Sequence, residues 1–264
     1  MGIFDGVLIS SDFDGTLFDG EKIAENNITA IRRFIEEGGH FTISSGRQYA
    51  FVKKMAELCP TSTYIIALNG ALIANPADGS VLYEGFIDGT AYAILDAMLD
   101  TDFEIDRVSF IKRGDENFSH LTPEEYGKKK AELCTSLVYD LVFHCPDPSV
   151  ARAAAAYARE VINERGIEGY TVVRSFATGV EILKLELTKG VAARRVARAV
   201  GAHTVIGVGD FENDIPLIKE ADIGYAVEGA VDELKAVADR ITVGVGDGAL
   251  ASVIRDVERE LLGR

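Results

Sequence analysis

Short apolar runs alternate along this chain with longer stretches in which apolar residues recur at helical spacing. The clearest runs cover residues 6–10, 64–68 and 204–208. Such runs are almost continuously apolar, which is typical of strands that are buried on both faces of a parallel sheet.

One amphipathic segment links the first two predicted strands. Ile28, Ile31 and Phe34 fall on one face of a helix, and the Gly-Gly pair at 38–39 ends that pattern before a second apolar strand at 41–44. The order strand, helix, strand predicts an α/β fold with a doubly wound parallel sheet.

A different pattern fills the middle of the chain. Four further strands are predicted there, separated by helical segments at 91–99 and 150–164; the strands are 81–87, 103–111, 137–143 and 170–174. We interpret residues 81–186 as an inserted α/β cap domain and residues 1–80 plus 187–264 as the core.

Strict alternation returns after the insertion. Helices are predicted at 189–200 and 213–219 and from 231 and 248 onward, with strands at 223–227 and 241–243. The core is therefore predicted to be split in sequence around the insertion.

Charge narrows the possible partners. The chain has 264 residues, of which 47% are hydrophobic, and its 27 basic and 42 acidic side chains give a formal charge of −15. This charge repels the nucleic-acid backbone, so nucleic acid is not an expected partner. A phosphate site here needs local cations and helix N-termini to reverse the sign of the field.

Apolar run lengths and cysteine spacing bear on the compartment. No stretch approaches the roughly 18 consecutive apolar residues that span a bilayer, so no membrane association is expected. Cys59, Cys134 and Cys145 are odd in number and form no C-x-x-C pair, which favours reduced thiols in a cytoplasmic protein and makes a zinc site improbable.

Two carboxylates follow directly after the first apolar strand. Asp12 and Asp14 lie in the sequence Asp-Phe-Asp-Gly-Thr, at the end of the strand where open parallel sheets bind ligands. A turn of Asp and Gly that only caps a helix is the alternative.

A second acidic motif follows a later strand. Asp210 and Asp214 lie in Gly-Asp-Phe-Glu-Asn-Asp after the run 204–208, and they bring two more carboxylates to the same sheet edge. Clustered carboxylates repel one another unless a cation lies among them, and oxygen ligands without His or Cys favour Mg²⁺. A capped helix start is the alternative for this segment alone.

Two weaker signals complete the set. Ser45, in Ser-Ser-Gly-Arg, follows the second strand and can offer its hydroxyl and helix-end amides to phosphate oxygens, although a plain helix cap explains it as well. Lys189 opens the helix after the insertion, where its ammonium can balance the acidic cluster; a solvated surface lysine is the alternative.

Taken together and in this order, these motifs resemble the haloacid dehalogenase-like hydrolases almost from end to end. The inserted α/β cap, together with Ala-Leu-Asn-Gly-Ala at 67–71 and Ala-Asp-Arg-Ile-Thr at 238–242, resembles the Cof-type subgroup (subfamily IIB). The resemblance implies that Asp12 is a nucleophile that forms an aspartyl phosphate and that Asp14 is the general acid and base. It further implies Mg²⁺ at Asp12, Asp14, Asp210 and Asp214, and phosphate binding at Ser45, Gly46, Lys189 and Asn213.

The predicted activity is hydrolysis of a small phosphorylated metabolite, with sugar phosphates as the default class, by a monomer or homodimer. The cap is expected to close over the site and select the leaving group. Its basic residues Lys112, Arg113 and 128–130 form either a solvated face or a contact for a second anionic group on the substrate. A phosphomutase or phosphotransferase would use the same intermediate, and a non-catalytic phosphate-binding regulator is the remaining alternative.

Overall fold

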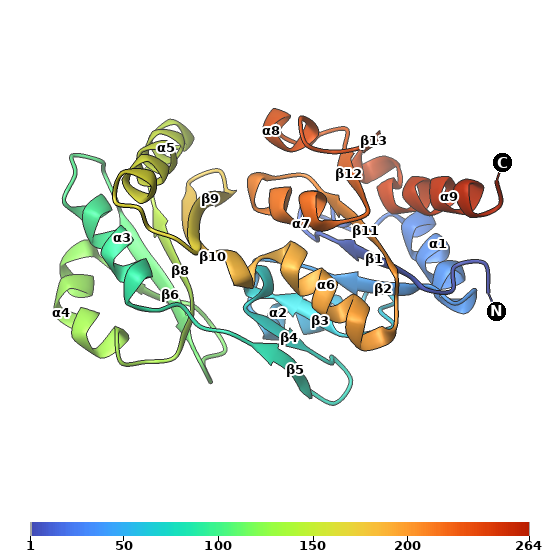
Figure 1. Ribbon diagram of the computed structural model, residues 1–264, viewed down its shortest axis with the longest axis horizontal. Coiled ribbons are helices and arrows are strands. Elements are labelled where there is room, and N and C mark those ends of the chain that lie inside the picture. Colours follow the sequence, from blue (N-terminus) through green and yellow to red (C-terminus); the bar gives the residue numbers. More distant parts are fainter. Residues whose placement is uncertain (1, 264) are drawn as a thin grey trace. The chain divides into compact units, whose positions relative to one another are not determined.

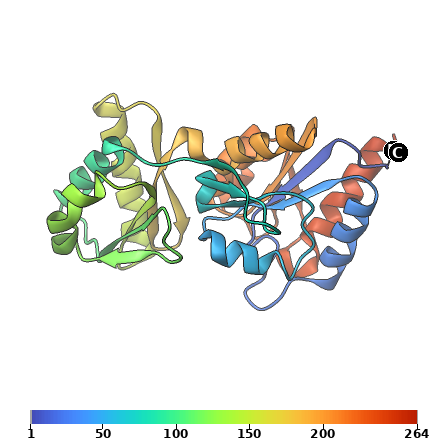
Figure 2. The same cartoon turned by 90° about the horizontal axis from the view of Figure 1, so that it is seen from below.

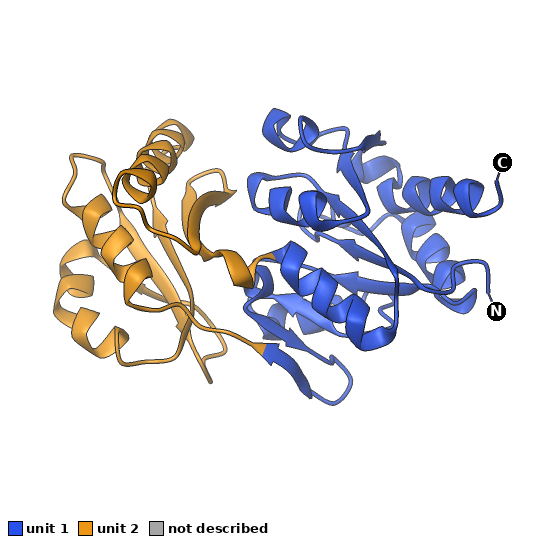
Figure 3. Ribbon diagram, viewed as in Figure 1, with its two compact units in different colours: residues 1–83, 189–264 blue, residues 84–188 orange. Residues whose placement is uncertain are grey.

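A computed structural model describes residues 2–263, which divide into two compact units. Unit 1 contains the chain up to Tyr83 and again from Lys189, and unit 2 is the segment Glu84–Thr188 between them (Figure 3). The chain passes between the units near residues 83 and 188, where the sequence placed the boundaries after residues 80 and 186.

Unit 1 is built on a five-stranded parallel sheet in the order β13-β12-β11-β1-β2. A smaller sheet, β3-β4-β5, adjoins it through a parallel bridge between Ser44 and Ile66. The strands of unit 1 are β1 (Val7–Ser11), β2 (His40–Ile43), β3 (Ile65–Ala67), β4 (Leu72–Ala74), β5 (Val81–Glu84, its last residue in unit 2), β11 (Thr204–Gly209), β12 (Ile223–Val227) and β13 (Arg240–Thr242).

Helices cover both faces of this sheet, as a doubly wound fold requires (Figures 1 and 2). Leu8 and Val205 belong to a buried cluster with Ala193 and Val196 of one helix and Leu217 of the next. On the opposite face, the first and last helices pack against each other. The helices of unit 1 are α1 (Glu25–Glu36), α2 (Tyr49–Met55), α6 (Lys189–Val200), α7 (Ile215–Glu220), α8 (Asp232–Lys235) and α9 (Ala249–Leu261), with short 3₁₀ turns at Leu68–Gly70, Glu212–Asp214 and Val245–Asp247.

Strand order makes one place in unit 1 special. The chain moves from β1 to β2 on one side and later returns to place β11 on the other side of β1. The crevice outside the carboxyl ends of two such strands is where open α/β sheets bind ligands. The residues that follow β1 and β11 are therefore the candidates for a ligand-binding site.

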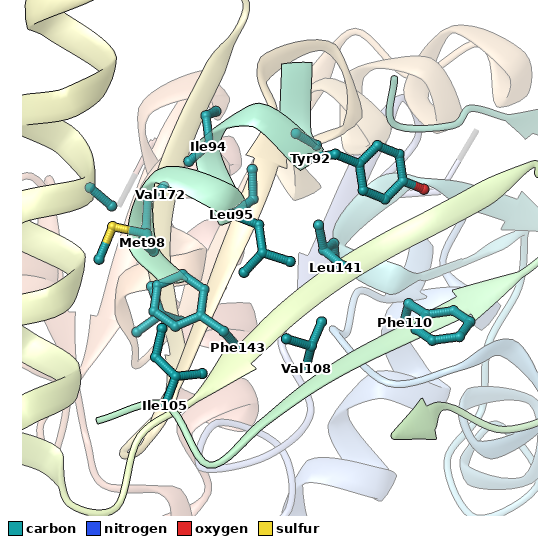
Figure 4. Close-up of a cluster of buried hydrophobic side chains, with 14 of the residues drawn as sticks. Tyr92, Ile94, Leu95, Met98, Ile105, Val108, Phe110, Leu141, Phe143 and Val172 are labelled. Carbon is teal, nitrogen blue, oxygen red and sulfur yellow. The ribbon is translucent and has the colours of Figure 1, made fainter. Parts of the chain in front are cut away.

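Unit 2 has an antiparallel sheet in the order β7-β6-β8-β10-β9. Its elements are α3 (Gly89–Leu99), β6 (Arg107–Lys112), β7 (Ser119–Leu121), α4 (Pro123–Leu133), β8 (Val138–His144), α5 (Pro148–Glu164), β9 (Tyr170–Phe176), β10 (Gly179–Lys184) and a 3₁₀ turn at Leu185–Leu187. Leu95 and Met98 of α3 pack toward Leu141 and Phe143 of β8 (Figure 4). Unit 2 therefore has its own hydrophobic core.

The predicted α/β class with a parallel sheet is confirmed, whereas several local predictions differ from the structure. The strand predicted at 103–111 begins only at Arg107, and β10 was not predicted. The helix α4 was not predicted either, although Thr122 and Glu125 form a capping box around Pro123 at its start. Apolar periodicity alone misses α4 because its buried residues are only Tyr126 and Leu133.

Within residues 2–263, no helix combines the length and the apolar character needed to cross a bilayer. Cys59, Cys134 and Cys145 are all free thiols, and burial raises the pKa of Cys59 to about 12.

Candidate active site

The carboxyl ends of β1 and β11 carry the acidic residues that the sequence singled out. Asp12 follows β1 directly and Asp210 follows β11, because the two strands are parallel and adjacent. One carboxylate oxygen from each of Asp12, Asp210 and Asp214 lies within 4.8 Å of the others. The structure thus gathers side chains that are almost 200 residues apart in sequence.

Lys189 bridges two of these carboxylates. Its Nζ donates a hydrogen bond of 2.6 Å to Oδ1 of Asp12 and another of 2.6 Å to Oδ1 of Asp214. The lysine is fully buried, since the exposed fraction of the residue is 0%. It opens α6 as predicted, but the structure excludes the alternative of a solvated surface lysine.

Asp214 is held from both sides. Its Oδ2 accepts the backbone N–H groups of Asp210 and Phe211, at 3.0 and 3.2 Å, while Oδ1 is engaged by Lys189. Asp214 belongs to a 3₁₀ turn, and α7 begins only at Ile215, so the helix predicted from residue 213 starts two residues later. The Asp214 side chain points back toward its own loop, where it pairs with two backbone N–H groups that have no partner within the turn.

Burial and mutual repulsion alter the proton affinities of these carboxyls. Burial raises the pKa of Asp210 to about 7, and the nearby charge of Asp214 adds to this effect, while a 2.9 Å hydrogen bond from Thr16 and the charge of Lys189 oppose it. Burial also raises the pKa of Asp12, against the opposing charge of Lys189. For Lys189, burial alone lowers the pKa, but the charges of Asp12 and Asp214 outweigh it and raise the value.

These groups fit a hard divalent cation. With all three carboxyls ionised, the cluster and the Lys189 ammonium carry two net negative charges in a largely buried space. Every atom of the cluster that could bind a metal is a carboxylate oxygen. Asp12 and Asp210 have the freer carboxylates, because both oxygens of Asp214 already accept hydrogen bonds. The donor set therefore suits Mg²⁺, with Asp214 better placed to orient Lys189 and the loop.

Asp14 lies apart from this buried cluster. Its side chain is 41% exposed and forms a two-pronged ion pair with Arg47, in which Nε donates to Oδ2 at 3.0 Å and Nη2 donates to Oδ1 at 3.1 Å.

The next residue, Gly15, has φ +87°, and a Cβ there would lie 2.5 Å from Oδ2 of Asp210. Glycine is therefore required for the loop to pass so close to Asp210.

The residues after β2 form a second hydrogen-bonded segment. Ser45 is buried, and its Oγ accepts the backbone N–H of Arg47 at 3.1 Å. The following helix α2 has Gln48 as its N-cap, so Ser45 does not cap it and lies before its first turn. A Cβ at Gly46 would approach Nδ2 of Asn69 to 3.0 Å, so a side chain at position 46 would be tight against that amide.

Asn69 connects this segment to the second acidic loop. Nδ2 of Asn213 donates a 3.0 Å hydrogen bond to Oδ1 of Asn69, whose own backbone N–H donates to the carbonyl of Ser45. Asn69 has φ +50°, a left-handed conformation that asparagine tolerates better than most residues. The loops after β2, β3 and β11 are thereby tied together.

Of the predicted site residues, Asp12, Asp210, Asp214 and Lys189 form one buried cluster, and hydrogen bonds join the segments of Ser45, Gly46 and Asn213. Three residues make site contacts that the sequence did not predict: Arg47 on Asp14, Thr16 on Asp210 and Asn69 on Asn213. Each belongs to one of the motifs described above, so membership in those motifs was the available signal.

Four of the basic residues that the sequence singled out in unit 2, namely Lys112, Arg113, Lys128 and Lys130, have carboxylate partners within that unit. Nζ of Lys112 lies 3.6 Å from Oε1 of Glu132, and Nη2 of Arg113 lies 2.5 Å from Oε1 of Glu84. Lys130 forms an ion pair with Asp96. These pairs agree with a solvated, self-neutralised face. The alternative role, contact with a second anionic group on the substrate, stays a prediction.

Comparison with known proteins identifies the family of this chain. The family model described as haloacid dehalogenase-like hydrolase matches residues 9–254, which include the acidic residues after both β1 and β11. The chain is 29% identical over 255 residues to the 5-amino-6-(5-phospho-D-ribitylamino)uracil phosphatase YcsE of Bacillus subtilis (strain 168), covering 93% of this chain and 94% of that protein.

Solved structures share the fold. A haloacid dehalogenase-like hydrolase from B. subtilis superposes with a TM-score of 0.74 at 20% identity, covering 94% of this chain and 98% of that one. A sugar phosphatase of HAD subclass IIB superposes with a TM-score of 0.72 at 19% identity, again covering 94% of this chain and 98% of the other. Both likenesses extend over unit 1 and unit 2.

Proposed function

The chain belongs to the haloacid dehalogenase-like hydrolases, and we propose that it is a Mg²⁺-dependent phosphatase that hydrolyses a small phosphorylated metabolite through a phosphoryl group carried on Asp12. The observation that carries this proposal is the buried cluster at the switch point of the sheet. There Asp12 shares Lys189 with Asp214 and lies beside Asp210.

Asp12 is the proposed nucleophile. One of its carboxylate oxygens bonds to phosphorus as the bond from phosphorus to the leaving oxygen breaks, which gives an aspartyl phosphate and a free alcohol. Lys189 supports this role, because its hydrogen bond fixes the Asp12 carboxylate and its charge lowers repulsion toward an incoming phosphate. Asp12 is also only 6% exposed, so few water molecules compete for that carboxylate.

Asp14 is the proposed proton carrier. Protonated Asp14 gives its proton to the leaving oxygen in the first step. In the second step its carboxylate takes a proton from water, the water oxygen bonds to phosphorus, and the bond to Asp12 breaks to release inorganic phosphate. Its exposed position supports this role, since the proton carrier must reach both the leaving group and water.

Mg²⁺ would be held by the carboxylates of Asp12 and Asp210 and the backbone carbonyl of Asp14, with Asp214 direct or through water. When bound, it would supply positive charge that shields Asp12 from the substrate phosphate. Monoester hydrolysis can require acceleration up to about 10²¹-fold, whereas acid–base catalysis gives about 10² to 10⁴. Positioning supplies about 7 to 11 kcal/mol of the roughly 28 kcal/mol required, so preorganised charge must supply the largest share.

Two relatives support a proposal for the substrate class. The YcsE phosphatase named above acts on a phosphorylated ribityl compound, and the subclass IIB neighbour is a sugar phosphatase. We therefore propose a phosphorylated sugar or sugar alcohol as the substrate.

The test is to trap the covalent intermediate. Wild-type protein with Mg²⁺ is mixed with a ³²P-labelled sugar phosphate and quenched in acid within one turnover. Label bound to protein and released by hydroxylamine is the expected result, since hydroxylamine cleaves acyl phosphates. Asp12→Asn should retain no label. Asp239→Asn is the matched control. Oδ2 of Asp239 accepts the backbone N–H of Gly224 near the amino end of β12, whereas Asp12 lies at the carboxyl ends of the strands.

Inorganic phosphate released without any acceptor sugar separates the phosphatase from a phosphomutase or phosphotransferase. The proposed intermediate would be refuted if substrate were hydrolysed without protein-bound label at any time and if Asp12→Asn were also active.

A further inference from the structure

The ion pair between Arg47 and Asp14 is unusually well organised for two exposed side chains. Two N–H groups of the guanidinium meet both oxygens of the carboxylate, at 3.0 and 3.1 Å, although the side chains are 52% and 41% exposed. Exposed ion pairs add little to stability, because solvent screens them and ordering two side chains costs entropy. Stability alone therefore does not account for this arrangement.

An aromatic side chain, Phe51, also packs against the guanidinium. The Arg47 guanidinium carbon lies 4.8 Å from the ring centroid of Phe51, on the first turns of α2. Phe51 in turn makes an edge contact with Phe13 at 6.1 Å. Phe13 is buried and lies between Asp12 and Asp14 in the sequence, so this chain of contacts returns to the loop that carries Asp14.

The backbone of Arg47 is fixed as well. Its N–H donates to Oγ of Ser45 at 3.1 Å, and its carbonyl accepts the N–H of Leu68 at 3.0 Å. The guanidinium thus starts from an anchored backbone, rests on Phe51 and ends on Asp14. Such support orients a side chain far better than a lone surface contact does.

We propose that Arg47 is a positioning residue, which holds the Asp14 carboxylate in one orientation while Asp14 takes the proton from the water that attacks the phosphoryl group on Asp12. This proposal rests on the proposed function. Arg47 need not touch the substrate in this role.

The pairing itself indicates the step. A guanidinium can only donate hydrogen bonds, so the form of Asp14 that accepts from it through both oxygens is the carboxylate. The carboxylate is the form that acts as base in the second step, after the proton has left with the alcohol. Two of its roughly four lone-pair positions remain for water. The first step uses protonated Asp14, and Arg47 does not favour that form, so Arg47 supports the second step and not the first.

The test is Arg47→Ala with Mg²⁺ and a sugar phosphate. Because the second step is slowed and the first is not, kcat should fall about 10-fold to 100-fold while kcat/KM should not fall. The ³²P-labelled phosphoenzyme should accumulate, and its decay after a chase with unlabelled substrate should slow by the same factor as kcat. Arg47→Lys should behave like Arg47→Ala, because an ammonium cannot form the two parallel bonds.

A double-mutant cycle identifies the partner. In the Asp14→Asn background, Arg47→Ala should change the phosphoenzyme decay rate by less than about twofold, because its effect passes through Asp14. Arg194→Ala is the matched control. The guanidinium of Arg194 donates two hydrogen bonds to the carboxylate of Asp222, at 2.8 and 3.0 Å. This pair lies at the amino end of β11, because Asp222 also accepts the backbone N–H of Val205 there. This control should leave kcat, kcat/KM and decay unchanged.

Three results would overturn the proposal. These are a fall in kcat/KM without phosphoenzyme accumulation, an undiminished effect of Arg47→Ala in the Asp14→Asn background, and full wild-type activity of Arg47→Lys. Absence of any phosphoenzyme in the wild-type protein would instead refute the proposed function, so the two failures are distinguishable.

Discussion

Asp210 should destabilise the metal-free protein at neutral pH, and Asp210→Asn should relieve this cost. Burial and the charge of Asp214 raise the pKa of Asp210 from 3.8 to about 7. In the unfolded chain the carboxyl ionises near its ordinary value, so the folded state binds the extra proton. The cost is absent below the unfolded pKa, grows as pH rises, and is complete above about pH 7.

The size of the effect follows from the shift. A shift of this size corresponds to roughly 4 kcal/mol, at about 1.4 kcal/mol per pKa unit, of which about 2 kcal/mol develops between pH 5.5 and pH 8. Asparagine keeps an oxygen that can accept the hydrogen bond of Thr16, so the substitution removes the charge with little change of shape. The metal-free variant should thus be more stable than wild type at pH 8, with a smaller difference at pH 5.5.

Urea unfolding followed by circular dichroism, with a chelator present, measures this difference at both pH values. Adding Mg²⁺ at pH 8 should then stabilise the wild-type protein, by about 2.7 kcal/mol when free Mg²⁺ is 100 times its dissociation constant, and should stabilise Asp210→Asn much less. Equal pH dependence of the two metal-free proteins would refute the reasoning, because the charge of Asp210 would then cost nothing on folding.

Three other predictions concern the same site. Asp12→Asn should abolish phosphate release while the far-UV circular dichroism stays that of wild type; turnover by this variant would remove Asp12 from its role. Lys189→Met should lower the free energy of unfolding of the metal-free protein by about 3 to 5 kcal/mol, measured in urea, because the carboxylates lose their buried counter-charge. Gly15→Ala should cost about 1 to 3 kcal/mol and weaken Mg²⁺ activation, since position 15 has positive φ and its Cβ would displace Asp210; a neutral result would show that the loop adapts.

Local sequence patterns carried most of the fold. The continuous apolar runs around β1 and β11 and the periodic residues of α1 and α6 predicted a parallel α/β sheet, which is confirmed. They did so because burial on both faces of a strand, or on one face of a helix, leaves a period that short windows of sequence record. Neither β10 nor α4 was predicted from these windows, and α4 buries few of its residues.

The family and its acidic motifs were also readable from the chain, because each motif is contiguous and lies directly after a predicted strand. Tertiary structure alone decided which side chains meet. Lys189 lies 177 positions from Asp12. It becomes the shared counter-charge of Asp12 and Asp214 only because α6 packs beside β11 in unit 1. Arg47 and Asp14 are 33 positions apart, and their pairing depends on how the loops after β1 and β2 leave neighbouring strands. Contacts of this kind depend on strand order and helix packing, which hydrophobic period and local motif do not encode.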